Sequence, residues 1–495
     1  MELIWNEINA PRLILRSTEQ TLPEGSIPPP EGKTVAELLD HTAEIVLDSC
    51  RTEAGRLNIE GRLIVKVLAA DENGELFAFT SEAPITHSVP GEGIEPGMGC
   101  EVLPRLTLLD LRRAPDGRLM LSAAVDLDCA VISAAPLRTL SGVNGVPDME
   151  IKTSEPPLVL RKELGSALLR LSDELSCDGA DTVIASSVQL SIRDTAFENG
   201  GVTVSGVAFV NALCRSADGE LVQLNRSLPF RQNVETDGTA DEVYASASLK
   251  SASVTALGTE FSLVALEAEA DISVFGLRPT APRLPLDAFS PTMNFSCIKQ
   301  KTILLSVLGG ANSQHSLRES VTVPDGMPDI FTAAYASCRP VVTDARIAGG
   351  ELTVDGLLPT RLIYRSAGGT LFTFTEEVPF NLRLAAPAGA QIPLLSMNGS
   401  CTITGASGRT AQIAYSLDVH AEFWSPAENE LIVGLAESEE IAERPASGLV
   451  IHTVSEGETV FDIAKRFRLP TASVRELNPD LGETVSAGDK VLLIV

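Results

Sequence analysis

The 495-residue sequence lacks the cysteine spacing and the apolar runs that mark disulfide-rich, zinc-binding or membrane-spanning chains. Its eight cysteines are scattered, and no two of them form a CxxC pair. Disulfide frameworks and zinc sites need clustered cysteines, so this spacing predicts reduced, mostly buried thiols. No stretch reaches the about 18 uncharged apolar residues of a membrane helix, so we expect no membrane span.

A secretory signal is also missing from the first residues, MELIWNEINAPRL. They carry Glu2 and Glu7 and contain no long apolar run. Signal peptides need a basic start followed by an apolar core. We therefore expect a cytosolic site of synthesis.

Basic residues are few for a chain of this length. Lys and Arg total 38 against 66 Asp and Glu, which gives a formal net charge of −28. Such a surface repels nucleic-acid phosphates and anionic lipid headgroups, so we expect no nucleic-acid partner. The same charge keeps a protein soluble.

Motifs of known enzyme classes are absent as well. The five histidines are not at metal-ligand spacing, and neither HExxH nor GxSxG occurs. EGKT at 31–34 is similar to a phosphate-binding loop, but Ile27 stands where that loop needs a glycine. We expect a protein that is not an enzyme, with no cofactor and no metal.

One hairpin pattern is present three times. ADENGELFAF, SADGELVQL and SAGGTLFTF begin at residues 70, 216 and 366. In the first copy, Asn73 and Gly74 suit the positive φ angles of a tight hairpin turn. The turn glycines of the three copies are Gly74, Gly219 and Gly369.

The spacing around these turns is constant. A glycine of the preceding strand stands 13 positions before each turn glycine, and a proline that ends the next strand stands 10 positions after it. The strand glycines are Gly61, Gly206 and Gly356, and the prolines are Pro84, Pro229 and Pro379. A period of 145 to 150 residues is that of a domain, and we expect each strand glycine to mark a bulge or a close backbone approach.

Apolar and polar residues alternate in the strands around each turn, as in LNIEGRLIVKV at 57–67. This is the pattern of a sheet with one dry face. The sequence predicts a mainly β fold with three tandem β-sandwich or barrel-like domains. Residues 161–175 fit a helix or an opening strand, and Pro359 predicts an edge or a bulge. Trp5 and the apolar LIL at 13–15 suggest that the N-terminal arm packs on a neighbouring domain.

The repeating pattern stops after Trp424. Residues 426–448 are rich in glutamate and contain Pro, Ser and Gly, which predicts a solvated linker, although its LIVGL stretch can still dock. Residues 449–495 then read as strand, helix, helix, strand. Thr459 is the expected N-cap of the first helix, with Asp462 in a capping box.

This terminal segment resembles a LysM domain. The shared features are the GETV turn at 457–460, Phe467, LNP at 477–479 and the closing strand VLLIV. His452 departs from the tyrosine that is common in the family, Glu458 and Val460 replace its commoner Asp and Leu, and the usual Ile-Pro ending is absent.

LysM domains commonly bind N-acetylglucosamine-containing polymers such as peptidoglycan. The resemblance implies a shallow groove between two loops, lined by Gly457, Glu458, Thr459, Val460, Asn478, Pro479, Asp480 and Leu481. Several of these residues also suit helix caps and turns. Contact with a protein partner is therefore an equally open alternative.

The three longer repeats resemble SPOCS domains of sporulation-associated proteins. The third copy carries the clearest match, with VPDGMPDI at 323–330, the strand glycine and the closing VPF. The expected division is 1–148 with an N-terminal arm, 149–290, 291–425, the linker 426–448 and the LysM segment 449–495. The layout is similar to that of SipL-like spore coat morphogenetic proteins.

The combined resemblance implies a non-enzymatic scaffold in the mother-cell cytoplasm that gathers at the forespore surface. Its LysM segment would dock a coat morphogenetic ATPase, another coat protein or a peptidoglycan-type glycan. Two alternatives stay open: a peptidoglycan-binding wall or cortex protein, and a self-assembling coat subunit that polymerises through strand edges.

Overall fold

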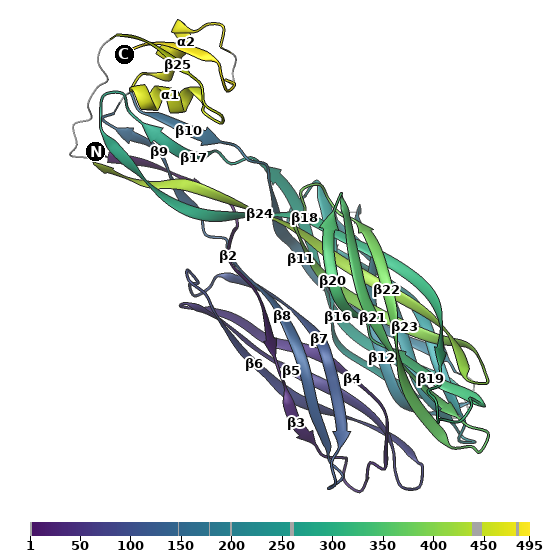
Figure 1. Ribbon diagram of the computed structural model, residues 1–495. Coiled ribbons are helices and arrows are strands. Elements are labelled where there is room, and N and C mark those ends of the chain that lie inside the picture. Colours follow the sequence, from purple (N-terminus) through teal and green to yellow (C-terminus); the bar gives the residue numbers. More distant parts are fainter. Residues whose placement is uncertain are drawn as a thin grey trace.

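The computed structural model describes residues 2–146, 148–177, 179–198, 200–257, 262–437, 448–481 and 485–495. Within these ranges it contains 26 strands and two short helices, which confirms the mainly β prediction. Figure 1 shows long bundles of strands lying side by side, with a smaller β unit and the C-terminal unit at one end.

Three two-sheet sandwiches make up most of the chain. The first contains β2 (Arg12–Thr21), β3 (Glu24–Ile27), β4 (Glu37–Glu53), β5 (Arg56–Ala70), β6 (Leu76–Pro90), β7 (Gly99–Arg113) and β8 (Leu119–Ser133). The second contains β11 (Leu158–Ser176), β12 (Ala180–Glu198), β13 (Gly201–Ser216), β14 (Leu221–Glu235), β15 (Glu242–Ala256) and β16 (Leu263–Thr280). The third contains β18 (Phe295–Thr322), β19 (Thr332–Cys338), β20 (Val341–Ala348), β21 (Glu351–Arg365), β22 (Leu371–Ala385), β23 (Ile392–Ser407) and β24 (Thr410–Glu437).

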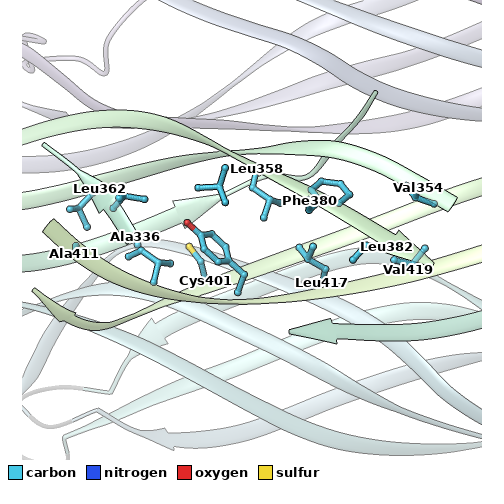
Figure 2. Packing of buried hydrophobic residues seen from close by; sticks show 14 of the residues in the cluster. Ala336, Val354, Leu358, Leu362, Phe380, Leu382, Cys401, Ala411, Leu417 and Val419 are labelled. Carbon is cyan, nitrogen blue, oxygen red and sulfur yellow. The ribbon is translucent and has the colours of Figure 1, made fainter. Parts of the chain in front are cut away.

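In each sandwich the repeated hairpin belongs to one sheet, and the opposite sheet is built around the long closing strand. The hairpin sheets are β4-β5-β6, β12-β13-β14 and β19/β20-β21-β22, and the closing strands are β8, β16 and β24. Alternate residues of both sheets point inward and fill the core, as period-two strands require. Figure 2 shows this for the third sandwich, where Leu358 and Phe380 of one sheet meet Leu417 and Cys401 of the other.

The three strand glycines occupy equivalent places in these sheets. Each lies in the central strand, opposite a β-bulge of the preceding strand. A Cβ at Gly61, Gly206 or Gly356 would come within 2.5, 2.5 or 2.4 Å of a carbonyl oxygen in that bulged strand. Only glycine fits such an approach, so the expectation of a bulge or close contact is confirmed.

The three hairpin turns share one hydrogen-bond pattern, but it is not the pattern expected. Gly74 N donates to Asp71 O at 2.9 Å and Asp71 N donates to Glu75 O at 3.0 Å, and the other two turns repeat both bonds. Among described non-glycine residues only Ser262 and Arg468 have positive φ, so Asn73 does not. The expectation for Asn73 was wrong because the glycine alone supplies the left-handed residue after an ordinary turn.

The repeated prolines lie inside strands rather than at their ends. Pro84, Pro229 and Pro379 belong to β6, β14 and β22, each of which pairs only with the central strand of its sheet. An edge strand tolerates proline because the missing N–H can face outward. Pro359 is in central strand β21, at the point where its partner changes from β19 to β20. The proline therefore lies between the segments of β21 that pair with β19 and with β20, and not at an edge or a bulge as expected.

The structure decides two further segments. Residues 161–175, which fit a helix or an opening strand, form the strand: they are part of β11, which pairs with β16 along its whole length, and tertiary pairing overrides helix propensity. The predicted linker begins as strand, since β24 pairs with β18 as far as Glu437. Leu431 and Ile432 are fully buried while Glu428 and Glu430 point outward. Residues 438–447 of that linker lie outside the described residues. So does Gly258, which with Leu257 suits a turn before the closing strand of the second repeat.

The three sandwiches meet through equivalent positions at one end. The residues seven and fifteen positions after each strand glycine share one apolar cluster, which contains Leu68, Leu213, Ile363, Leu76, Leu221 and Leu371. Elsewhere one guanidinium connects all three: Arg161 of the second sandwich pairs with Glu101 of the first and with Glu422 of the third, the latter at 2.8 Å.

The ends of the three sandwiches join in a fourth unit that the sequence did not predict. β1 (Glu2–Ile8) pairs with β9 (Leu137–Asn144), β10 (Glu150–Ser154) pairs with β17 (Leu284–Phe289), and the start of β18 pairs with the end of β24. Each pair comes from the two ends of one sandwich, and all three contribute to one apolar cluster. Trp5 packs on this unit beside Arg138, which confirms that the N-terminal arm is packed.

We predict that Gly356→Ala destabilises the protein by about 2 to 4 kcal/mol, because the new methyl group meets Phe380 and the Val341 carbonyl oxygen. Urea unfolding followed by tryptophan fluorescence measures this change. Gly405→Ala in β23 is the matched control, since nothing lies within 4 Å of its new methyl group, and it should change stability by less than about 0.5 kcal/mol. Equal effects of the two substitutions would contradict the close-approach argument.

Candidate functional site in the C-terminal unit

The C-terminal unit has the predicted order of elements. It consists of β25 (Leu449–Thr453), α1 (Val460–Phe467), α2 (Thr471–Leu477) and β26 (Lys490–Ile494), and the two strands pair antiparallel. Thr459 begins α1 through the expected capping box with Asp462. Val460, Ile463 and Ala464 line the buried face of α1 and pack on the strands.

The first loop of the predicted groove uses most of its side chains internally. The Glu458 carboxylate lies 2.8 Å from His452 Nε2 and 3.0 Å from an Arg466 nitrogen, and its side chain is only 6% exposed. Thr459 is occupied in the cap of α1, and Val460 is buried in the core. Of this loop, only Gly457 is exposed.

The second loop of the groove is held by Asn478. Its side-chain nitrogen donates to Val474 O and to Leu492 O, and its oxygen accepts from Leu492 N, each at 2.7 Å. These bonds tie the end of α2 to β26, so Asn478 is a structural residue. Pro479 and Asp480 are exposed, and Leu481 is half-buried against the core.

Several of the predicted groove residues are therefore used within the unit itself. Of the eight predicted residues, Gly457, Pro479 and Asp480 are exposed, whereas Glu458, Thr459, Val460 and Asn478 stabilise the unit itself. A ligand here would meet an apolar ring, one carboxylate and a backbone turn. Such a surface can accept hydrogen bonds from glycan hydroxyls or from the cationic donors of a protein.

A second surface of the unit is engaged by the rest of the chain. Figure 1 shows α1 lying over β10 and β17. Lys465 Nζ contacts both carboxylate oxygens of Asp287 at 2.7 and 2.8 Å, and Lys152 Nζ contacts Asp462 at 3.1 Å. Thr471 N, at the start of α2, donates to a Glu150 oxygen at 2.8 Å. We call this contact the docking interface.

An aromatic residue lies at the centre of the docking interface. Phe289, the last residue of β17, is 6% exposed and belongs to the same apolar cluster as Val460 and Val474. Its ring meets Phe461 edge to face, with 5.1 Å between the ring centres. The fourth unit thus contributes a side chain of β17 to the core of the C-terminal unit, which makes docking apolar as well as ionic.

The charged groups of the docking interface determine the pH range in which docking is stable. Burial raises the pKa of Asp287, but the hydrogen bond and charge of Lys465 outweigh it, and the net pKa is lowered. Asp462 behaves alike, with Thr459 and Lys152 outweighing burial to lower its pKa. Their contribution to docking is therefore complete at neutral pH, and it is lost as the pH falls from the ordinary aspartate pKa through these lowered values.

Sequence reasoning missed the docking interface. Its residues are charged or aromatic side chains scattered between Lys152 and Thr471, and no motif connects them. The only available signal was Phe289, an aromatic residue at the end of the second repeat. A single aromatic residue does not identify its partner.

Comparison with known families supports one part of the chain directly. Residues 34–111 match the family model described as SipL, SPOCS domain. The matched range contains Gly61, the first hairpin turn and Pro84, so the SPOCS resemblance holds for this part of the chain. No curated protein and no solved structure matches the chain.

Two further observations concern the described residues alone. In these ranges no helix is both long enough and apolar enough to cross a bilayer. Nor do three His, Cys, Asp or Glu side chains group there in a way that could hold a metal ion.

We predict that Asn478→Ala destabilises the C-terminal unit by about 2 to 4 kcal/mol, because it removes three part-buried hydrogen bonds that tie α2 to β26. Hydrogen exchange of α2 and β26 reports the loss. The neighbouring Asp480→Ala is the control, and its effect on stability should stay within about 0.5 kcal/mol. A neutral Asn478→Ala would show that this residue does not hold the unit together.

We predict that Lys465→Glu weakens docking about tenfold or more, because it places a carboxylate beside Asp287. Small-angle scattering should then give a larger radius of gyration, and β17 should exchange its amide hydrogens faster. Lys490→Glu makes the same charge change at an exposed site of β26 and should leave docking intact. If both variants behaved alike, the docking interface would not depend on this ion pair.

Proposed function

We propose that this protein is a non-enzymatic scaffold in spore coat or envelope assembly. The observation that carries the proposal is the match of residues 34–111 to the SPOCS domain of SipL, a family linked to sporulation. The equivalent bulge at each of Gly61, Gly206 and Gly356 supports extending this assignment to the second and third sandwiches. Repeated sandwiches offer several similar surfaces to partners.

In this proposal the C-terminal unit is a LysM domain that docks a coat morphogenetic ATPase, another coat protein or a peptidoglycan-type glycan. The order of elements and the capping box support the LysM assignment. Docking on β10 and β17 occupies α1, while Pro479 and Asp480 stay exposed. The unit would thus be held by the scaffold and still present its second loop at the forespore surface.

A peptidoglycan-binding role is the second candidate, and the open loop at Pro479 and Asp480 favours it. A pull-down on purified peptidoglycan should compare Asp480→Ala with wild type. Asp480 is the better probe than Asn478, because a substitution at Asn478 also removes structural hydrogen bonds. Self-assembly through strand edges is less well supported, because prolines in β6, β14 and β22 discourage edge pairing.

We predict that deleting residues 448–495 disperses the protein from the forespore surface while the three sandwiches remain folded. The deletion removes one apolar contact at Phe289 and a few ion pairs, and leaves the sandwich cores untouched. Fluorescence microscopy of a tagged chain in sporulating cells gives the localisation, and circular dichroism of the purified variant gives the fold. Unchanged localisation of the folded variant would contradict the proposed role of this unit.

A further inference from the structure

In two of the sandwiches, a cysteine of one sheet lies near a cysteine of the opposite sheet. Cys177 and Cys214 belong to the second sandwich, and Cys338 and Cys401 belong to the third. All eight cysteines are described as free thiols, four of them buried and four half-buried. In both pairs the two cysteines belong to the same apolar cluster of their sandwich. None of these four residues has a role in the proposed function.

The third sandwich brings its sheets together beside Cys338 and Cys401. Cys338 ends β19 in one sheet, and Cys401 lies in β23 of the other. Two residues further along, Pro340 lies so close to β23 that a Cβ at Gly399 would be 2.7 Å from its ring. Only glycine permits this approach. The two sheets are therefore close together beside Cys338 and Cys401.

The Gln223 side chain of the second sandwich contacts β19 and β23 of the third sandwich at the same level. The Gln223 amide nitrogen donates to Ala336 O of β19 at 3.1 Å and to Cys401 O of β23 at 3.5 Å. Because one nitrogen reaches both carbonyl oxygens, the two strands are close neighbours at this level. Figure 2 shows the Cys401 sulfur within the core, near Ala336.

The second sandwich brings its thiols together at a crossing point of the chain. Cys177 follows β11 of one sheet, and Ala180 begins β12 of the other, with Ala180 N donating to Cys177 O at 3.1 Å. Ala180 pairs with Ser216, two residues from Cys214 on the same strand. The sheets are therefore joined by backbone next to this pair, and both cysteines belong to one apolar cluster.

The first sandwich has a looser contact of the same kind. Cys100 Sγ donates to Cys50 O at 3.4 Å, so this thiol is directed at backbone instead of the other thiol. Cys297 differs again, because its thiol donates to Ala288 O at 3.4 Å. These two arrangements serve as internal comparisons for the two closer pairs.

We propose that Cys177–Cys214 and Cys338–Cys401 are modification sites at which oxidation forms disulfides between opposite sheets. In each pair both S–H bonds break and one S–S bond forms. The two electrons and two protons pass to a two-electron thiol oxidant, for example a diazene that is reduced to the hydrazine. Each bond adds a covalent link between two opposite sheets of one sandwich, so it locks the sandwich against opening.

The environment of the thiols keeps them reduced until an oxidant reaches them. Burial and the neighbouring thiol raise the pKa of Cys214 to about 12, so little reactive thiolate exists at neutral pH. The hydrogen bond from Cys338 and burial likewise raise the pKa of Cys401. The disulfides therefore form slowly, during transient opening of the sandwich edge, and persist once formed.

The test treats the full-length protein with diamide overnight, blocks the remaining thiols with N-ethylmaleimide, and maps the peptides without reduction. We expect the crosslinks Cys177–Cys214 and Cys338–Cys401, while Cys297 stays a free thiol and carries the maleimide. The midpoint temperature of thermal unfolding should rise by roughly 5 °C, and it should return to its starting value when the disulfides are reduced. Cys338→Ser should remove one crosslink and leave the other.

Three results would overturn the proposal. The four cysteines could all carry maleimide after diamide treatment, they could be linked to other cysteines or between chains, or their crosslinks could lower the unfolding temperature. Peptide mapping of the wild-type chain decides between these results even if the Cys338→Ser variant does not fold.

Discussion

All three sandwiches depend on one close contact. A carbonyl oxygen of a bulged strand approaches the Cα of a glycine in the central strand. At Gly61, Gly206 and Gly356 the bulged strand comes so close that any Cβ would collide with its backbone. The bulge bends that strand and fixes its register against the central strand, since slipping by one residue would bring a side chain into the contact. The alternating apolar faces then close into a core.

Because the same constraint acts three times, the sandwiches can combine through matched surfaces. One end is joined by equivalent leucine and isoleucine side chains, and the other by a unit assembled from the ends of all three sandwiches. Arg161 adds an ionic link between the two glutamates of its neighbours. This arrangement gives the C-terminal unit a firm base on β10 and β17, so its position is determined by the repeats.

Local features of the sequence predicted local structure well. The spacing of Gly61, its turn glycine and Pro84 located one hairpin sheet in each sandwich, and the capping residues around Thr459 located α1. The sequence left the outcome open where distant segments decide it. Residues 161–175 fit a helix or a strand, and pairing with β16 makes them a strand. The acidic stretch after Trp424 contains Leu431 and Ile432, which are buried in clusters to which all three repeats contribute. Which of the predicted groove residues hold the unit together depends on partners elsewhere in the chain, such as Leu492 for Asn478.

The central functional claim is that this chain gathers other proteins at the forespore without performing chemistry. Crosslinking followed by mass spectrometry in sporulating cells tests it most directly. The account predicts crosslinks from residues 448–495 to a coat assembly protein, and from the sandwiches to further coat proteins. Crosslinks confined to unrelated cytosolic enzymes, or a chain that never reaches the forespore, would contradict it.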